Sequence, residues 1–307
     1  KVYLDSAATT QMRDEVIERM VTVMKETYGN PSSTHAFGRT SKSLIENARK
    51  TVANKLNVSA SEIIFTSGGT EADNLALNSA VRDLGVKRII TSCIEHHAVL
   101  YTVNQLKDRY NIEVQYVDLD DCGNIQLPHL ESLLESSAEK TLVSLMNVNN
   151  EIGNLLDIQK VGELCRKYNA LFHCDTVQTM GHYKHDLTKL HIDFLTCAAH
   201  KLHGPKGVGF LYINHNVKIK PLLYGGAQER NMRGGTENVY GIVGLAKALE
   251  IACEEMEQHR KHIENLKKHL YSLLKMHLPG VKFNGLSADM EKSLYTVLNV
   301  SLPPSEE

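Results

Sequence analysis

Short apolar runs alternate with longer amphipathic stretches between about residues 61 and 213, and this alternation constrains the fold more than any other feature. Seven of the runs have the length and the β-branched or aromatic content of buried strands: 63–65, 88–90, 114–117, 142–145, 171–174, 194–196 and 209–213. Helical spacing fills most of the intervals, as in 71–84, 99–110 and 158–168. This order predicts βαβ units and an α/β fold with a mostly parallel seven-stranded sheet flanked by helices.

A different pattern begins near Val239, where apolar residues keep helical spacing for more than 30 residues. A helix of that length is unusual in a globular domain, and we expect it to bridge two domains. We assign residues 13–256 to a large domain and residues 1–12 together with 257–307 to a smaller α+β domain. The run 295–302 looks like a strand, and a domain seldom ends one strand into a new βα unit. We therefore expect the small domain to be truncated on its C-terminal side.

Composition argues against several classes of protein. A formal net charge of −2 over 307 residues gives no basic face for nucleic acid or an anionic membrane. No apolar run approaches the roughly 20 residues that span a bilayer, and residues 1–5 lack the features of a signal peptide. The cysteines form no Cys-x-x-Cys pair, which favours reduced thiols and a cytoplasmic protein. They are Cys93, Cys122, Cys165, Cys174, Cys197 and Cys253.

The segment 66–72, Thr-Ser-Gly-Gly-Thr-Glu-Ala, lies between a predicted strand and a predicted helix. Ligands of parallel sheets gather at the carboxyl ends of the strands. Gly69 would let the backbone approach a phosphate at the N-terminus of the helix, and Thr70 would add a hydroxyl group. The alternative is a tight turn in which Thr70 caps the helix. The spacing does not match a Walker loop.

Lys201 follows the predicted strand that ends near Cys197 and lies among small and apolar residues. A buried lysine has a lowered pKa and can act as an amine nucleophile, whereas the alternative is an ordinary solvated charge. His200 and His203 are near it in sequence, but no third ligand lies at metal spacing. We therefore expect no metal site.

Other polar residues follow three more strands. Asp175 can cap the next helix or pair with a pyridine nitrogen, and Gln178 comes one turn later. Asn150 lies in a run of amides after the strand 142–145. His96 can stack on a planar ring and carry protons, although a lone histidine is more often structural.

These features together resemble the cysteine desulfurases, a branch of the fold-type I, class V aminotransferase-like pyridoxal-phosphate enzymes. The resemblance covers nearly the whole chain and is carried by the stretches 3–10, 29–33, 65–71, 149–153, 200–207, 225–230 and 233–238.

The resemblance implies a pyridoxal 5'-phosphate cofactor held by Lys201 as a Schiff base, with Lys201 and His96 as the catalytic residues. Asp175 would bind the pyridine nitrogen, with Gln178 and Asn150 near the phenolic oxygen. The phosphate would be bound by Gly69, Thr70 and His200, helped by Thr236 from the other subunit of a homodimer. Ala198 stands where many relatives have a phosphate-binding serine.

The implied reaction converts L-cysteine to L-alanine and a sulfane sulfur for iron–sulfur cluster or thio-cofactor assembly, with a sulfur-acceptor or scaffold protein as a partner. The family's sulfur-accepting cysteine and its substrate-binding arginine are expected beyond Glu307. The chain as given is therefore expected to bind the cofactor but to lack the nucleophile. The alternatives are a selenocysteine lyase, another class V aminotransferase-like enzyme, and a non-catalytic scaffold.

Overall fold

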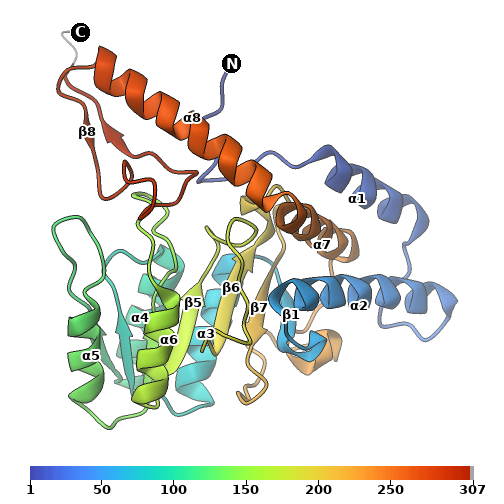
Figure 1. Ribbon diagram of the computed structural model, residues 1–307. Helices are drawn as coiled ribbons and strands as arrows, with labels where there is room; N and C mark the ends of the chain where they lie inside the picture. Colours follow the sequence, from blue (N-terminus) through green and yellow to red (C-terminus); the bar gives the residue numbers. More distant parts are fainter. Residues whose placement is uncertain (305–307) are drawn as a thin grey trace.

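A computed structural model describes residues 1–304 and shows one large sheet beside a small two-stranded one (Figure 1). The large sheet has the strand order β1-β7-β6-β5-β4-β2-β3. β7 is antiparallel to both of its neighbours, and the other pairs are parallel. These strands are β1 (Ile63–Thr66), β2 (Arg88–Thr91), β3 (Glu113–Tyr116), β4 (Thr141–Ser144), β5 (Leu171–Asp175), β6 (Phe194–Ala198) and β7 (Gly209–Ile213). The predicted mostly parallel seven-stranded α/β fold is confirmed, and residues 305–307 of the predicted small domain lie outside the described residues.

Helices cover both faces of the sheet. On one face, α3 and α4 pack against alternate strand residues such as Ile89 and Leu211. On the other face, α1, α2, α5, α6 and α7 pack around residues such as Phe172 and Phe210. Since strand side chains alternate between faces, His173 and Asp175 of β5 point toward the α3 side. These helices are α1 (Asp14–Glu26), α2 (Ala36–Leu56), α3 (Gly69–Arg82), α4 (His97–Tyr110), α5 (Leu127–Glu135), α6 (Ile158–Lys167) and α7 (Val239–Glu254).

The predicted long helix after Val239 is two helices. α7 is followed by α8 (Met256–His277), and Glu255 between them has φ −100° and ψ 6°, which breaks the helix. α7 is buried, whereas α8 extends beyond the sheet toward the chain's C-terminus (Figure 1). None of the helices within residues 1–304 is both long enough and apolar enough to cross a membrane.

The strand predicted over 295–302 is much shorter in the structure. Only β9 (Val300–Ser301) forms, and it pairs antiparallel with β8 (Lys282–Phe283). Tyr295 is instead buried, and its hydroxyl lies 2.8 Å from Nδ1 of His182. The N-terminal half of the predicted strand is thus packed against the large sheet's loops instead of continuing the hairpin.

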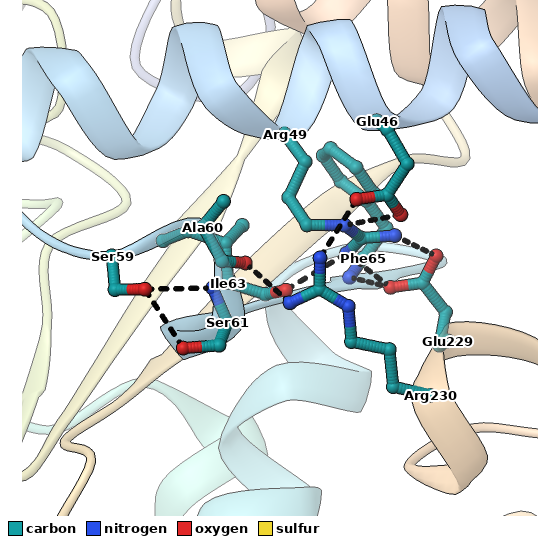
Figure 2. Close-up of polar contacts among 9 residues, drawn as sticks. All are labelled: Glu46, Arg49, Ser59, Ala60, Ser61, Ile63, Phe65, Glu229 and Arg230. Atoms are coloured by element: carbon teal, nitrogen blue, oxygen red, sulfur yellow. Dashed lines mark hydrogen bonds and ion pairs between the residues drawn. The ribbon is translucent and has the colours of Figure 1, made fainter.

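A buried ion pair ties α2 to the loop that precedes α7 (Figure 2). The guanidinium of Arg49 and the carboxylate of Glu229 form a bidentate pair at 2.7 and 2.8 Å. Arg49 also donates to the backbone oxygen of Ile63 at 2.8 Å, and Glu229 also accepts from the backbone N–H of Phe65 at 2.8 Å. We call Arg49 and Glu229 the clamp. Both side chains are buried, so each finds its partners inside the protein.

The loop held by the clamp has a strained backbone. Glu229, Arg230 and Asn231 have φ values of 42°, 57° and 64°, a left-handed region that non-glycine residues seldom adopt. Arg230 also anchors this loop: it forms an ion pair with Glu46 at 2.7 Å and donates a hydrogen bond to the backbone oxygen of Ala60 (Figure 2). These contacts hold the loop in a shape that it would not adopt alone.

β7 brings together two segments that are far apart in the sequence. Thr66 at the end of β1 and Ala198 at the end of β6 both pair with Gly209, the first residue of β7. A Cβ atom at Gly209 would lie 2.3 Å from the backbone oxygen of Cys197 and 2.9 Å from Cα of Gly68. Only glycine permits this approach. The residues that follow β1 therefore lie beside those that follow β6.

Candidate active site

A cavity of about 430 Å³ lies at the carboxyl ends of the strands. Its walls come from several strand ends because the carboxyl ends of parallel strands meet at one edge of a sheet. Thr236 is absent from the lining, but the other predicted cofactor-binding residues all contribute: Gly69, Thr70, His96, Asn150, Asp175, Gln178, His200 and Lys201. The structure therefore brings together residues that the sequence places after five different strands.

One end of the cavity is formed by the N-terminus of α3. Gly68 at the N-cap provides no side-chain cap, so the first N–H groups of α3 keep their hydrogen-bonding capacity. A Cβ atom at Gly69 would lie 2.9 Å from Cγ2 of Val177, which leaves no room for a larger residue. Thr70 adds its side chain beside these groups. Free N–H groups and the positive end of the helix dipole make this end suited to an anion.

Lys201 lies in η2 (Ala199–Lys201), the single 3-10 turn that follows β6. Its Nζ donates a hydrogen bond to the backbone oxygen of Ala7. Burial lowers the pKa of Lys201, although nearby carboxylates, Asp175 first among them, oppose this shift. A lowered pKa increases the fraction of free amine, which is the nucleophilic form.

Asp175 ends β5, and its Oδ1 accepts a hydrogen bond from the N–H of Val177 at 2.9 Å. Burial raises the pKa of Asp175 to about 7, and the neighbouring Asp73 adds to the rise. A cation placed against Asp175 would stabilise its ionised form and lower that pKa again. Gln178 lies in the next turn, where its Nε2 donates to the backbone oxygen of Ala7 at 3.1 Å.

His96 and Asn150 form another part of the wall. His96 is the N-cap of α4, and its Nδ1 accepts from the N–H of Ala98 at 3.1 Å. That bond requires an unprotonated Nδ1, so a neutral His96 carries its proton on Nε2. Asn150 lies in the loop after β4 and donates from Nδ2 to Oε1 of Glu151 at 2.8 Å. His96 can therefore donate a hydrogen bond through Nε2–H, and Asn150 presents a polar amide.

The sequence predicts no site residue in the N-terminal segment, yet Asp5, Ala7 and Ala8 line the cavity. This segment is tied to the lysine turn, because the N–H and Oγ1 of Thr10 both donate to the backbone oxygen of His200, at 2.9 and 2.8 Å. The only feature of the sequence that could have indicated this role is that residues 3–10 are one of the stretches that resemble the cysteine desulfurases. Their position over Lys201 depends on backbone contacts, which the sequence does not show.

Two buried carboxyl groups near the cavity carry no predicted role. Asp73 lies one turn into α3, lines the cavity and is 1% exposed, and burial raises its pKa to about 7. Glu95 precedes His96 and is 5% exposed, and burial raises its pKa to about 8. Within residues 1–304, Oε2 of Glu95 makes no hydrogen bond, and Oδ1 of Asp73 makes none either, although Nε2 of His173 lies 3.3 Å from it. Acidic residues usually face solvent, so the sequence gives no sign of this burial.

Thr236 lies outside the cavity, in a hollow of about 180 Å³ that it shares with Thr66 and Ser67. Arg233, three residues earlier, forms an ion pair with Glu71 in the first turn of α3 at 2.9 Å. This pair links the loop of Thr236 to the N-terminal end of α3. In the chain as described, however, Thr236 does not reach the cavity.

Metal-binding geometry is not found in the described part of the chain. Among residues 1–304, no group of three or more His, Cys, Asp or Glu side chains is placed to hold a metal ion. His200 and His203, the predicted neighbours of Lys201, instead bond to the N-terminal segment: Nδ1 of His200 lies 3.1 Å from Oγ1 of Thr9, and Nδ1 of His203 lies 2.8 Å from the backbone oxygen of Gln11.

Comparison with known proteins adds three kinds of similarity. The family model described as aminotransferase class-V matches residues 2–305. A putative cysteine desulfurase of Bacillus subtilis (strain 168), IscS 1, is 42% identical over 306 residues, which cover 99% of this chain and 79% of the relative. The cysteine desulfurase IscS of Methanosarcina thermophila is 46% identical over 287 residues, which cover 92% of this chain and 70% of the relative.

Solved structures agree with these relatives. A NifS-like protein superposes with a TM-score of 0.93 at 43% identity, covering 99% of this chain and 82% of the other. A cysteine desulfurase from Thermococcus onnurineus NA1, in its apo form, superposes with a TM-score of 0.88 at 26% identity, covering 98% of this chain and 79% of the other. The likeness extends over nearly the whole chain.

Proposed function

Because this chain belongs to the class V aminotransferase family, and within it to the cysteine desulfurases, we propose that it converts L-cysteine to L-alanine and an enzyme-bound sulfane sulfur. Enzymes of this family depend on pyridoxal phosphate, and the fold is that of fold type I. The observation that carries the proposal is a single cavity in which a buried lysine, a buried aspartate and an uncapped helix N-terminus meet. The sulfur would serve iron–sulfur cluster or thio-cofactor assembly.

The residues around the cavity fit pyridoxal phosphate. The N-terminus of α3 with Gly69 and Thr70, joined by His200, would hold the phosphate. Asp175 would pair with the ring nitrogen, since burial raises the pKa of this carboxyl and a cation beside it would favour its ionised form. Gln178 and Asn150 would lie near the phenolic oxygen, and Lys201 would hold the cofactor covalently through Nζ. When bound, the cofactor accepts the electron pair left at the substrate's α-carbon.

Lys201 and His96 supply the proton transfers in this proposal. The backbone oxygen of Ala7 orients the amine of Lys201, and the lowered pKa keeps a share of it free to remove the α-proton. The bond from Ala98 to Nδ1 orients the ring of His96 so that Nε2–H can donate a hydrogen bond, and His96 would transfer a proton from Nε2 once Nδ1 has been protonated and has released that bond. Both residues line the cavity, so both can reach a substrate bound there.

We propose that the cysteine that accepts the sulfur is not one of the six in this chain. Cys165, Cys174 and Cys197 are buried, and burial raises the pKa of each thiol, which disfavours the reactive thiolate. Cys93 and Cys122 are exposed, but no cysteine and no arginine of the described residues lines the cavity. In this proposal the acceptor thiol and the substrate-binding arginine lie outside the residues that line the cavity.

We propose a cytoplasmic homodimer in which Thr236 of the partner subunit completes the phosphate site. All six cysteines are free, which fits a reducing compartment. The Arg233–Glu71 ion pair supports a fixed position for the loop that carries Thr236. Residues 13–256 would form the large domain, with 1–12 and 257–307 in the small one, and a sulfur-acceptor or scaffold protein would take the product sulfur.

Borohydride treatment followed by peptide mapping tests the assignment of Lys201. The reductant fixes the cofactor to the amine that holds it, so the pyridoxyl group should be found on Lys201. Lys201→Ala should abolish this label and lower alanine formation by the full-length enzyme by about 10³-fold. Lys206→Ala is the matched control and should leave both unchanged. A pyridoxyl label on Lys206, or no label at all on the cofactor-loaded protein, would show that the assignment of Lys201 is wrong.

A further inference from the structure

A buried polar network lies behind Asp175, within the apolar α3 side of the sheet. His173 of β5 has no exposed surface. Its Nδ1 lies 2.9 Å from Oγ of Ser144 on β4, and its Nε2 lies 3.2 Å from Oγ1 of Thr196 on β6. The same Nε2 lies 3.3 Å from Oδ1 of Asp73 on α3, an oxygen that makes no hydrogen bond in this arrangement. Three adjacent strands and a helix thus contribute one polar group each, and each of these residues is at most 1% exposed.

This network is connected to the cofactor cavity at two points. Asp73 lines the cavity directly, and Asp175 lies two residues after His173 on the same face of β5. Like charges at Asp73 and Asp175 disfavour each other, and the pKa of Asp175 is raised first by burial and then by Asp73. The charge on Asp73 therefore changes the electrostatic potential at the place where the ring nitrogen of the cofactor would bind.

Asp73 and His173 can satisfy each other in two protonation states. When Asp73 is a neutral acid, its hydroxyl can donate to Nε2 while Nδ1–H donates to Ser144. When Asp73 is ionised, Nε2–H can donate to it while the hydroxyl of Ser144 donates to Nδ1, since a serine hydroxyl can both donate and accept. Burial lowers the pKa of His173 to about 4, so the imidazole stays neutral in both states. The pair as a whole therefore carries either no charge or one negative charge.

We propose that Asp73 and His173 are positioning residues that share one proton between Oδ1 and Nε2, and that the charge of this pair controls how tightly Asp175 holds the protonated ring nitrogen of the cofactor. The inference rests on the proposed function, because it concerns the same cofactor site. Nearby titratable groups are Asp175 on β5, Glu95 after β2, and His96 and Lys201, which face Asp175. Of these, only Asp175 shares the strand of His173.

Cofactor affinity measured at two pH values tests the proposal on the full-length enzyme. Asp73→Asn keeps a donor for Nε2 of His173 but fixes the pair in its neutral state. The pKa of Asp73 is about 7, so wild type and variant should bind pyridoxal phosphate within about twofold at pH 6. At pH 8.5 the variant should bind about tenfold more weakly, because only the wild type then has the extra negative charge. The cofactor's absorbance should also lose one pH-dependent step in the variant.

Asp193→Asn is the matched control. Oδ2 of Asp193 accepts from the N–H of Phe172 at 2.8 Å, and Asp193 lines no part of the cavity. This variant should shift stability without changing the ratio of cofactor affinities at the two pH values. Equal losses of affinity at both pH values in Asp73→Asn would indicate a purely structural role and would overturn the proposal. An unchanged affinity ratio would overturn it as well.

A measurement on the unmodified enzyme covers the case in which Asp73→Asn does not fold. In enzyme labelled with ¹⁵N-histidine, the ring of His173 should change from the Nδ1–H to the Nε2–H tautomer between pH 6 and pH 8.5, with His173→Asn identifying the signal. A single tautomer throughout would contradict the shared proton. If wild-type enzyme failed to bind the cofactor at either pH, the proposed function itself would be wrong, which distinguishes the two failures.

Discussion

Arg49 and Glu229 are buried as deeply as Asp73 and Asp175, but the two places differ in what surrounds the charge. The clamp pairs a cation with an anion and adds two backbone hydrogen bonds, so its charges have partners within the chain. Asp73 and Asp175 line the cavity and Glu95 lies near it. None of the three forms an ion pair with a lysine or arginine of residues 1–304, and burial raises the pKa of all three. The clamp therefore stabilises the fold without any ligand. The buried carboxyl groups at the cavity gain a cationic partner only when a ligand binds.

The strongest test of this difference removes one side of the clamp. Glu229→Ala leaves the buried guanidinium of Arg49 with only the partly exposed Glu46, at 3.2 Å, as an anion, and leaves the N–H of Phe65 without its acceptor. We expect the free energy of unfolding, measured by urea denaturation, to fall by about 3–5 kcal/mol. Glu250→Ala is the control, because the partner of Glu250 is the half-exposed Lys247 and the pair should contribute at most about 1 kcal/mol. If both variants lost a similarly small amount of free energy of unfolding, the clamp would be no more important for stability than the exposed pair.

In the cavity, replacing a carboxylate by a neutral side chain should raise the free energy of unfolding instead of lowering it. Asp175→Asn keeps an oxygen that accepts from Val177 but removes the buried charge, so the cofactor-free protein should gain on the order of 2 kcal/mol at pH 8. The same variant should bind pyridoxal phosphate more weakly, because the ring nitrogen loses its ionic partner. Urea denaturation and cofactor titration check the two effects. Stability that falls together with affinity would show that Asp175 serves the fold instead.

Asp186→Asn is the control for that experiment. Hydrogen bonds from Thr188 and Asn57 lower the pKa of Asp186 to about 2, so its charge is stabilised by the fold. Loss of this carboxylate should destabilise the protein and leave cofactor affinity unchanged. The two aspartates would then differ in the sign of the stability change.

The last prediction concerns the pH dependence of the stability of the cofactor-free protein. Burial raises the pKa of Asp73 and Asp175 to about 7 and of Glu95 to about 8. Folding therefore binds protons at these groups, and stability falls as pH rises from their unfolded values to those folded values. Burial lowers the pKa of three histidines to about 4, which makes stability rise up to about pH 6.5: His173, His182 and His185.

Below about pH 6.5 the carboxyl groups lower the free energy of unfolding as pH rises while the histidines raise it. Above about pH 6.5 only the carboxyl groups change it. We expect the free energy of unfolding to change little from pH 5 to pH 6.5 and then to fall between pH 6.5 and pH 8, by up to about 1 kcal/mol per pH unit for each group. Urea denaturation at half-unit steps measures this. A rise over the upper interval would show that the cavity carboxyl groups are already compensated.

The two regions also differ in how well the sequence predicts them. The cavity residues that follow strands could be identified because parallel strands bring their carboxyl ends together, and Lys201 lies directly after a buried strand. The clamp could not be predicted, since Arg49 and Glu229 are 180 positions apart and charged residues are usually exposed. The break at Glu255 was equally hidden, because no glycine or proline marks it. Burial of Asp73 depends on tertiary packing, which periodicity does not contain.

The antiparallel β7 has a consequence for how the protein is made. β1 lies at the edge of the sheet, and β7 is its only strand partner within residues 1–304. During synthesis from the N-terminus, the apolar strand Ile63–Thr66 therefore waits unpaired until residues 209–213 have left the ribosome. The N-terminal end of α3 and the turn of Lys201 meet only then, on either side of Gly209. A nascent chain shorter than this should be unable to capture the cofactor, and the exposed strand makes it a substrate for chaperones.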